Sequence, residues 1–248
     1  MSHYAVAVFH RRDQQIEDLL APYDENLEVE PYIKFSRQEA IEFARKHYKD
    51  FDSKSDEECW QFMVDEDTKT DSEGNIYSTY NPKSKWDWYQ EGGRWSGLLK
   101  GHGVESDEAL VRDIDFGPDL VKYAHALRFW DVVVDHQPLK PNETEDDYFN
   151  FYKEEYYRER YGDRETYARY IAQFSTFAVV TPDGEWHEKG EMGWFGCSSD
   201  TAEDERDWEE HYKERFIDTA DPDWILTIVD CHIYIRSPVP LRKTLPRA

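Results

Sequence analysis

The chain has 248 residues, of which 39% are hydrophobic and 16% are aromatic, so it is long enough and apolar enough to bury a substantial core. Its 54 acidic residues outnumber its 30 basic ones, and the formal net charge of −24 argues against direct binding to nucleic acid or to an anionic membrane. An anionic ligand would therefore need a locally basic pocket.

No apolar run approaches the roughly 20 residues that a membrane-spanning helix needs. The first apolar run, 4–9, is short and is followed at once by charged residues, unlike a signal peptide. The cysteines Cys59, Cys197 and Cys231 are widely spaced without a Cys-x-x-Cys pattern, which indicates neither a disulfide framework nor a zinc site. We therefore predict a cytoplasmic protein that carries no metal and no other cofactor.

The first part of the chain predicts one buried strand, two well-capped helices and a set of aromatic strands. Small and β-branched residues predict a strand at 4–9, and a weaker pattern predicts a helix at 14–20. Ser36 and Ser55 are each followed three residues later by a glutamate, the capping-box pattern that opens a helix. Strand-like aromatic segments follow between 77 and 95.

The rest of the chain predicts two more strands, a hairpin and two helices. In chain order these are a strand at 129–136, a helix at 144–172, hairpin strands at 174–180 and 185–188, a helix at 201–217 and a strand at 224–235. Gly162 is expected to split the long helix. The hairpin turn at 181–184 contains Pro182 and Gly184, whose backbone preferences suit a turn.

The order of these elements predicts the fold class. Strands lie near both ends and in the middle of the chain, with helices irregularly between them. This order favours an α+β fold, a mixed and mainly antiparallel sheet covered by helices, over a doubly wound parallel sheet. We predict one domain over residues 1–236, and we expect the proline-containing segment 237–248 to be a mobile tail.

The densest group of residues suited to ligand binding lies between positions 81 and 95. Gly92 and Gly93 permit close backbone approach, Arg94 offers a planar fork of donors to phosphate or carboxylate, and the aromatic rings could stack on a base. The predicted ligand-binding residues here are Lys83, Lys85, Trp86, Trp88, Tyr89, Gly92, Gly93, Arg94 and Trp95. The alternative is that the tryptophans are core, the glycines form a hairpin turn and Arg94 pairs with Asp87.

Histidines and aspartates at predicted strand ends form a second candidate site. They are His10 after the first strand, Asp135 and His136 after the central strand, and Asp230 and His232 within the last. If the three strands are neighbours, these side chains could converge for general acid–base catalysis. The alternative is that each histidine is a polar strand terminus or a satisfied core group. No metal-ligand spacing such as His-x-His is present.

Two further features each allow two interpretations. His187 and Trp194 lie on a glycine-bounded stretch that could form a pocket wall, or could close the end of the sheet. The acidic runs are most simply solvated loops and helix ends, but they are also compatible with DNA mimicry, in which carboxylates replace phosphates.

The segment from Asn81 to Trp95 resembles the signature of a family of phage and prophage proteins. The stretches Leu20 to Asn26, Thr181 to Trp186, Gly190 to Gly196 and Leu226 to His232 are similar to other parts of that family. The resemblance implies a viral origin, and hence a host bacterial cytoplasm, and it carries no activity with it.

Together these patterns favour a protein that binds and sequesters a small anionic nucleotide-type ligand. By analogy of class with phage anti-defence proteins, that ligand could be a host immune signal such as a cyclic ADP-ribose isomer or a cyclic dinucleotide. One alternative is a metal-independent or His-dependent hydrolase that cleaves such a nucleotide. The other is an acidic DNA-mimic decoy that binds a host protein. The aromatic content also permits a homo-oligomer.

Overall fold

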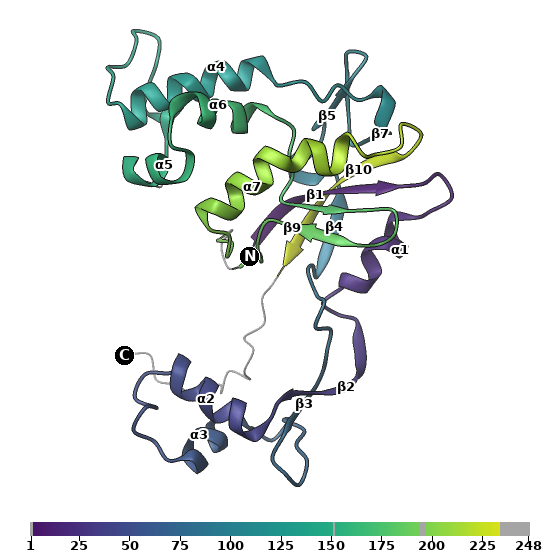
Figure 1. Cartoon of the computed structure of the whole chain (residues 1–248), viewed down its shortest axis with the longest axis vertical. Helices are drawn as coiled ribbons and strands as arrows, with labels where there is room; N and C mark the ends of the chain where they lie inside the picture. The colour runs from purple at the N-terminus through teal and green to yellow at the C-terminus, as the bar shows by residue number, and fades with distance from the viewer. Residues whose placement is uncertain (1, 151, 194–196, 234–248) are drawn as a thin grey trace. The chain divides into compact units, whose positions relative to one another are not determined.

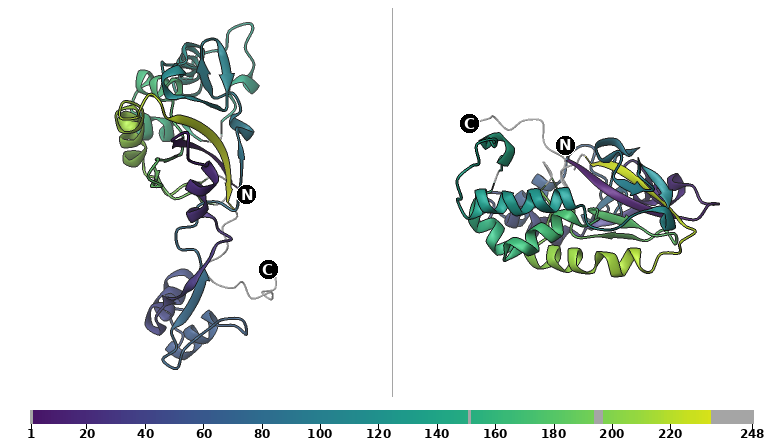
Figure 2. Two further views of the ribbon diagram at one scale, coloured as in Figure 1. Left: turned by 90° about the vertical axis from the view of Figure 1, so that its right-hand side faces the viewer. Right: turned by 90° about the horizontal axis from the view of Figure 1, so that it is seen from above.

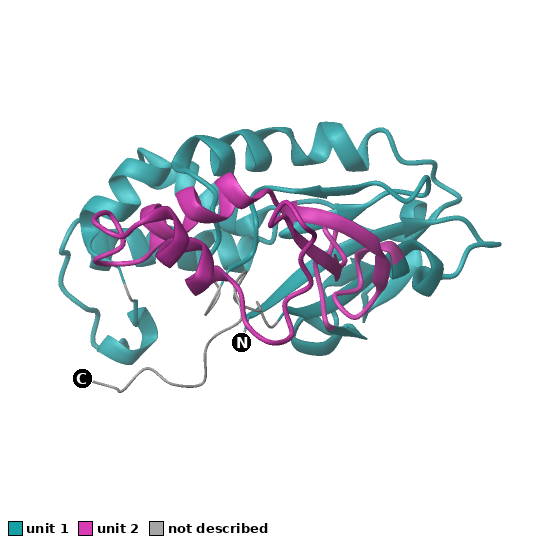
Figure 3. Ribbon diagram, turned by 90° about the horizontal axis from the view of Figure 1, so that it is seen from below, with its two compact units in different colours: residues 1–21, 88–233 teal, residues 22–87, 234–248 magenta. Residues whose placement is uncertain are grey.

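The computed structural model describes residues 2–150, 152–193 and 197–233, and these form an α+β fold, as the sequence predicts. The chain divides into two compact units (Figure 3). Unit 1 contains residues 1–21 and 88–233, and within the described chain unit 2 contains residues 22–87. One domain over residues 1–236 stays a prediction, and its expected tail lies outside the described residues.

Unit 1 is built on a mixed sheet in which only one strand pair is parallel. Its strands are β1 (Ser2–His10), β4 (Trp88–Glu91), β7 (Glu108–Leu110), β8 (Ala178–Val180), β9 (Trp186–Glu188) and β10 (Ile225–Ile233). Their order is β4-β10-β1-β8-β9, with β7 pairing beside β4 on the same side of β10. The pair β1 and β8 is parallel and the others are antiparallel, which confirms the predicted sheet type.

The first and last described strands form the centre of this sheet. β1 and β10 pair along their whole length, from Ser2 opposite Ile233 to His10 opposite Ile225, and they lie side by side in Figure 2. Their apolar side chains are buried on both faces, as expected for central strands with a neighbour on each side. The sequence predicts both strands, with β1 starting two residues earlier than expected.

One helix covers the face of the sheet that carries Ala7 and Ile228 (Figure 1). This is α7 (Ala202–Tyr212), which continues as a π-helix, Lys213–Ile217, so the prediction of a helix at 201–217 is confirmed. It packs Trp208, Tyr212 and Phe216 against the sheet. The face so covered is the one toward which His3, Asp230 and His232 also point, by strand alternation from Ala7 and Ile228.

A second helical cluster of unit 1 comprises α4 (Leu120–Phe129), α5 (Glu154–Tyr161) and α6 (Arg164–Ala172). The prediction of a strand at 129–136 is wrong, because the apolar run continues α4 as a π-helix, Trp130–Val134. A short apolar run alone does not distinguish a buried strand from a buried helix end. The backbone N–H groups of the first turn of α4 donate to the side chain of Asp119, which starts this helix.

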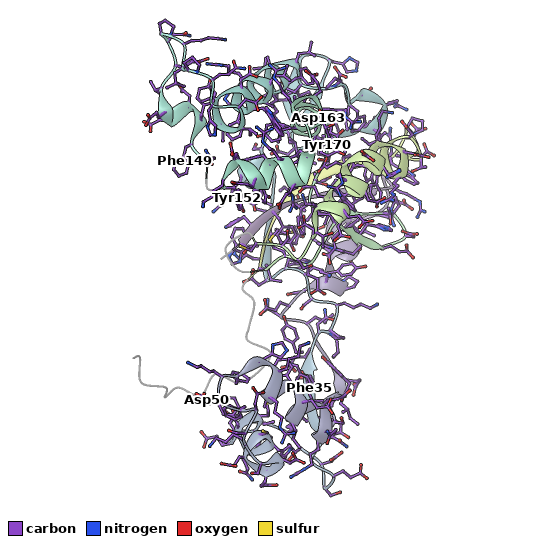
Figure 4. The ribbon with its side chains drawn as sticks, turned by 60° about the vertical axis from the view of Figure 1, so that its left-hand side comes forward. Phe35, Asp50, Phe149, Tyr152, Asp163 and Tyr170 are labelled. Atoms are coloured by element: carbon purple, nitrogen blue, oxygen red, sulfur yellow. The ribbon has the colours of Figure 1, made fainter. Side chains whose placement is uncertain are left out.

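The predicted long helix at 144–172 is three shorter elements. A 3-10 turn, Glu145–Tyr148, is followed by α5 and α6, which Gly162 separates at a φ of +78°. The predicted break at Gly162 is therefore confirmed. The side chain of Asp163 caps α6 (Figure 4).

Unit 2 pairs β2 (Glu28–Phe35) with β3 (Ile76–Tyr80) and adds α2 (Arg37–His47) and α3 (Asp56–Met63). Both predicted capping boxes are present: Ser36 caps α2 and Ser55 caps α3. The two helices and β3 share a small core of their own, formed by Ala40, Ile41, Ala44, Cys59, Met63 and Ile76. β2 is not predicted from the sequence, because its glutamates and its proline hide the alternation that marks a strand, and none of its side chains is buried.

The remaining elements are short. They are α1 (Ile16–Leu20), β5 (Leu99–Gly101), β6 (Val104–Ser106) and the 3-10 turns Ala21–Tyr23, Gly93–Trp95 and Val111–Asp113. α1 confirms the weak helix predicted at 14–20, and β8 with β9 confirms the predicted hairpin. None of the helices in the described ranges is both long enough and apolar enough to cross a membrane.

Candidate functional site

Three of the five predicted acid–base candidates lie apart from His232. His10 is at the opposite end of β1, buried, with its Nε2 3.0 Å from Oγ1 of Thr227. His136 follows the π-helix, where its exposed ring contacts Glu154, and the neighbouring Asp135 accepts a hydrogen bond from Arg158. The structure therefore does not bring His10, Asp135 and His136 together with Asp230 and His232.

The residue that does join Asp230 and His232 is His3, which was not among the predicted candidates. In the β1–β10 pair His3 lies opposite His232, and Asp230 is two residues away on the same face. Nδ1 of His3 lies 2.8 Å from Oδ1 of Asp230, and the rings of His3 and His232 have centroids 5.0 Å apart. The signal that could have found His3 is the pairing of the two terminal strands, which no local pattern reveals.

The His3–Asp230 contact fixes the orientation of the imidazole. An ionised carboxylate only accepts hydrogen bonds, so Nδ1 of His3 carries the hydrogen and donates it to Asp230. In the neutral form of His3, Nε2 then carries the lone pair, the arrangement in which an aspartate orients a histidine that acts as a base. The His3 side chain is 14% exposed and that of Asp230 is 4% exposed, so water screens this pair only weakly.

Trp88 completes an aromatic layer over the two histidines. It lies opposite His232 in the β4–β10 pair, and the two rings stack at a centroid distance of 5.2 Å and an angle of 17°. The rings of Trp88 and His3 also form an edge-to-face pair with centroids 5.4 Å apart. Trp88 remains 43% exposed, an unusual amount for so large an aromatic side chain. We refer to His3, Trp88, Asp230 and His232 as the His3 cluster.

The loop after β4 is fastened to this cluster through Asp230. The backbone N–H of Arg94 donates to Oδ2 of Asp230 at 3.1 Å, so the carboxylate holds the loop on one side and His3 on the other. Gly93 has a φ of +53°, and a Cβ there would lie 2.7 Å from Oδ2 of Asp230 and closer still to its Cβ. Only glycine fits this position without displacing the carboxylate.

A second carboxylate holds the other end of the same loop. Asp107 accepts hydrogen bonds from the backbone N–H of Gly97 at 2.6 Å and from the hydroxyl of Ser96 at 3.1 Å. It also lies against Gly92, whose φ is +63° and which has no room for a Cβ beside the Asp107 carboxylate. The glycine pair thus permits close approach to the backbone, as predicted, and the groups that approach it are the carboxylates of Asp107 and Asp230.

The guanidinium of Arg94 is exposed at the end of this loop. Within the part of the chain that the structure describes, it makes no ion pair with a carboxylate. Most of the described arginines do so, for example Arg128 with Glu143 and Arg164 with Asp131. In a chain with a net charge of −24, an unpaired arginine is a locally basic position.

The other members of the predicted aromatic cluster are divided between the two units. Lys83, Lys85 and Trp86 belong to unit 2, where Trp86 is buried and its carbonyl accepts from the N–H of Glu25. Tyr89 pairs with Cys231 and so faces the opposite side of the sheet from Trp88, and burial raises its pKa to about 12.

Trp95 packs against the core beneath α7. Of the nine residues predicted in this cluster, Trp88, Gly93 and Arg94 contact the His3 cluster directly or belong to it.

His187 lies in a separate groove between β9 and α7, with a volume of about 750 Å³. Its ring contacts Phe216, and its Nε2 is 3.8 Å from a carboxylate oxygen of Glu185. The nearby Arg215 is paired with Asp207. Trp194, predicted to belong with His187, lies outside the described residues.

Across the described ranges, no group of three or more His, Cys, Asp or Glu side chains is arranged to hold a metal ion. The side chains that the His3 cluster offers are two imidazoles, one carboxylate and an indole ring. No protein-family model, no curated protein and no solved structure matches this chain.

Proposed function

We propose that this chain binds a small anionic ligand that carries a flat ring, such as a nucleotide, at the surface formed by Trp88 and Arg94. The observation that carries the proposal is the exposed guanidinium of Arg94, which has no carboxylate partner in the described chain. The backbone N–H of Arg94 is held by Asp230 of the His3 cluster.

The phosphate and the base of such a ligand each have a suitable side chain at this surface, Arg94 for the phosphate and Trp88 for the base. A guanidinium presents paired N–H donors that match phosphate oxygens, and hydrogen bonds to charged groups are stronger than neutral ones. The 43% exposed ring of Trp88 offers an apolar surface for a base, and stacking of a base on an aromatic side chain contributes about 1–3 kcal/mol. Because the whole chain repels anions, binding depends on this local site.

The resemblance to phage proteins extends the proposal to a biological role. The ligand would be a nucleotide signal of the bacterial host, such as a cyclic ADP-ribose isomer or a cyclic dinucleotide, and binding would lower its free concentration. The support for this step is the resemblance of residues 81–95 together with the chemistry of Arg94.

The test is calorimetric titration of the protein with cyclic di-AMP, a cyclic ADP-ribose isomer and AMP. Losing a charged hydrogen bond of about 1.5–3 kcal/mol predicts that Arg94→Gln weakens binding by about 10-fold to 100-fold. Arg12→Gln is the matched control, since Arg12 is also exposed and unpaired in the described chain but follows the far end of β1. Equal losses in the two variants, or no binding of any probe to the wild-type protein, would refute the proposal.

A further inference from the structure

We propose that the groove between β9 and α7 binds a linear polyamine, a flexible alkyl chain that carries several protonated amines. This inference goes beyond the proposed function, because other residues of unit 1 than Trp88 and Arg94 form the groove and its ligand has the opposite charge. The groove has a volume of about 750 Å³, which lies within the range of small-molecule sites in proteins.

The groove is long in one direction. On its helical side the lining runs from Asp204 to Phe216, which corresponds to roughly 18 Å of helix. On the other side it follows β9 from Trp186 to Glu188 and continues to Lys189. A groove of this length fits an extended chain better than a compact ring.

The bottom of the groove is aromatic. The ring of Phe216 contacts the rings of His187 and Trp208, with centroid distances of 5.4 Å in both cases, and all three residues line the groove. Trp208 and Phe216 are almost fully buried, which places them at its base. The methylene groups of a polyamine can lie on such a surface, and the faces of aromatic rings attract ammonium groups.

The charged side chains leave the groove acidic. Three of its lining residues are carboxylates, Glu188, Asp204 and Asp207, and two are permanent cations, Lys189 and Arg215. Both cations already have carboxylate partners: Arg215 lies 2.9 Å from Asp207, and Lys189 lies 3.5 Å from Glu205 of α7. An anionic ligand would have to displace these partners, whereas the net charge of −24 attracts a polyvalent amine.

Asp204 is the carboxylate that we assign as the main anchor for an amine. Its side chain accepts hydrogen bonds from the backbone N–H and the hydroxyl of Thr201, which caps α7, and within the described ranges it makes no ion pair with Lys or Arg. The backbone hydrogen bond, together with that from the hydroxyl, lowers the pKa of Asp204. The carboxylate is therefore ionised at neutral pH and retains lone pairs for a further donor.

The first test is calorimetric titration with spermidine, a linear triamine, in about 0.15 M salt, where charges are screened beyond roughly 8 Å. Asp204→Asn removes the charge but keeps an oxygen that can accept from Thr201, so it should weaken binding about 10-fold while α7 stays capped.

Asp163→Asn is the matched control. Asp163 also holds the start of a helix, α6, through hydrogen bonds from backbone N–H groups, and it does not line the groove (Figure 4). This variant changes the net charge by the same amount and should weaken binding less than about 2-fold. Equal losses in the two variants would mean that spermidine is a counterion of the whole acidic chain, and would overturn the assignment.

The second test locates the bound amine and examines the aromatic surface. In NMR spectra, spermidine should shift the backbone amides of β9 and α7, and shifts spread evenly over the acidic loops would contradict a site in the groove. Phe216→Leu keeps an apolar side chain but removes a ring, so it should weaken binding about 2-fold to 5-fold. Wild-type affinity in this variant would refute the aromatic contribution, and no binding of spermidine to the wild-type protein would refute the proposal as a whole.

Discussion

Replacing Gly93 by alanine should destabilise unit 1 and disturb the His3 cluster together. The alanine would have to adopt the left-handed φ of +53° found at Gly93, which costs an L-residue about 1–2 kcal/mol. It would also lie within 2.7 Å of Oδ2 of Asp230 and push that carboxylate away from the N–H of Arg94. A lost hydrogen bond to a charged group adds about 1.5–3 kcal/mol, for a total of about 2.5–5 kcal/mol.

Gly103→Ala is the matched control for this change. Gly103 lies in the same unit with a φ of +78°, but a Cβ there would meet nothing within 4 Å. It should therefore cost only the backbone term of about 1–2 kcal/mol. At about 2–4 °C per kcal/mol for a chain of this size, scanning calorimetry should show Tm losses of about 10 °C for Gly93→Ala and about 4 °C for Gly103→Ala. Equal losses would show that Asp230 does not depend on a glycine at position 93.

Two further predictions concern parts of the chain away from the His3 cluster. The hydrogen bond from Arg128 lowers the pKa of Glu143 from 4.5 to about 2, so the stability that this pair contributes is complete above about pH 4.5 and is lost as the pH falls toward 2. In urea titrations, the difference in unfolding free energy between wild type and Glu143→Gln should become smaller over that range. A constant difference would contradict the pairing. Ser36→Ala removes the cap of α2 and should cost about 1 kcal/mol, seen as faster amide exchange in α2. Ser53→Ala, at an exposed serine outside any helix, should leave that exchange unchanged.

The features that could be predicted from the sequence are those whose cause is local. The capping boxes at Ser36 and Ser55, the break at Gly162 and the turn at 181–184 each depend on a few adjacent residues, and all are present. The prediction of a strand over the apolar run 130–134 is wrong because its structure is not set locally. The run is helical because it continues α4, and no strong sequence pattern predicts α4.

The candidate site could be predicted only in part. Asp230 and His232 share a face by strand alternation alone, and Gly93 and Arg94 stand out by residue type. Which histidine joins them depends on strand pairing across the whole chain, so the sequence indicates His10 and His136 and gives no local sign of His3. The predicted aromatic cluster is continuous in sequence, but Trp86 and Trp88 belong to different compact units.

The pairing of β1 with β10 also determines when the His3 cluster can exist. His3 and Asp230 are 227 positions apart, so their contact closes a very long loop, and pairings of this kind form slowly because chain entropy is lost before the contact is gained. During synthesis, β1 leaves the ribosome long before β10 does. Until β10 has been made, β1 can pair with segments that precede β10 in the chain, such as β8. Any binding at this cluster would therefore begin only after β10 has been made and has paired with β1.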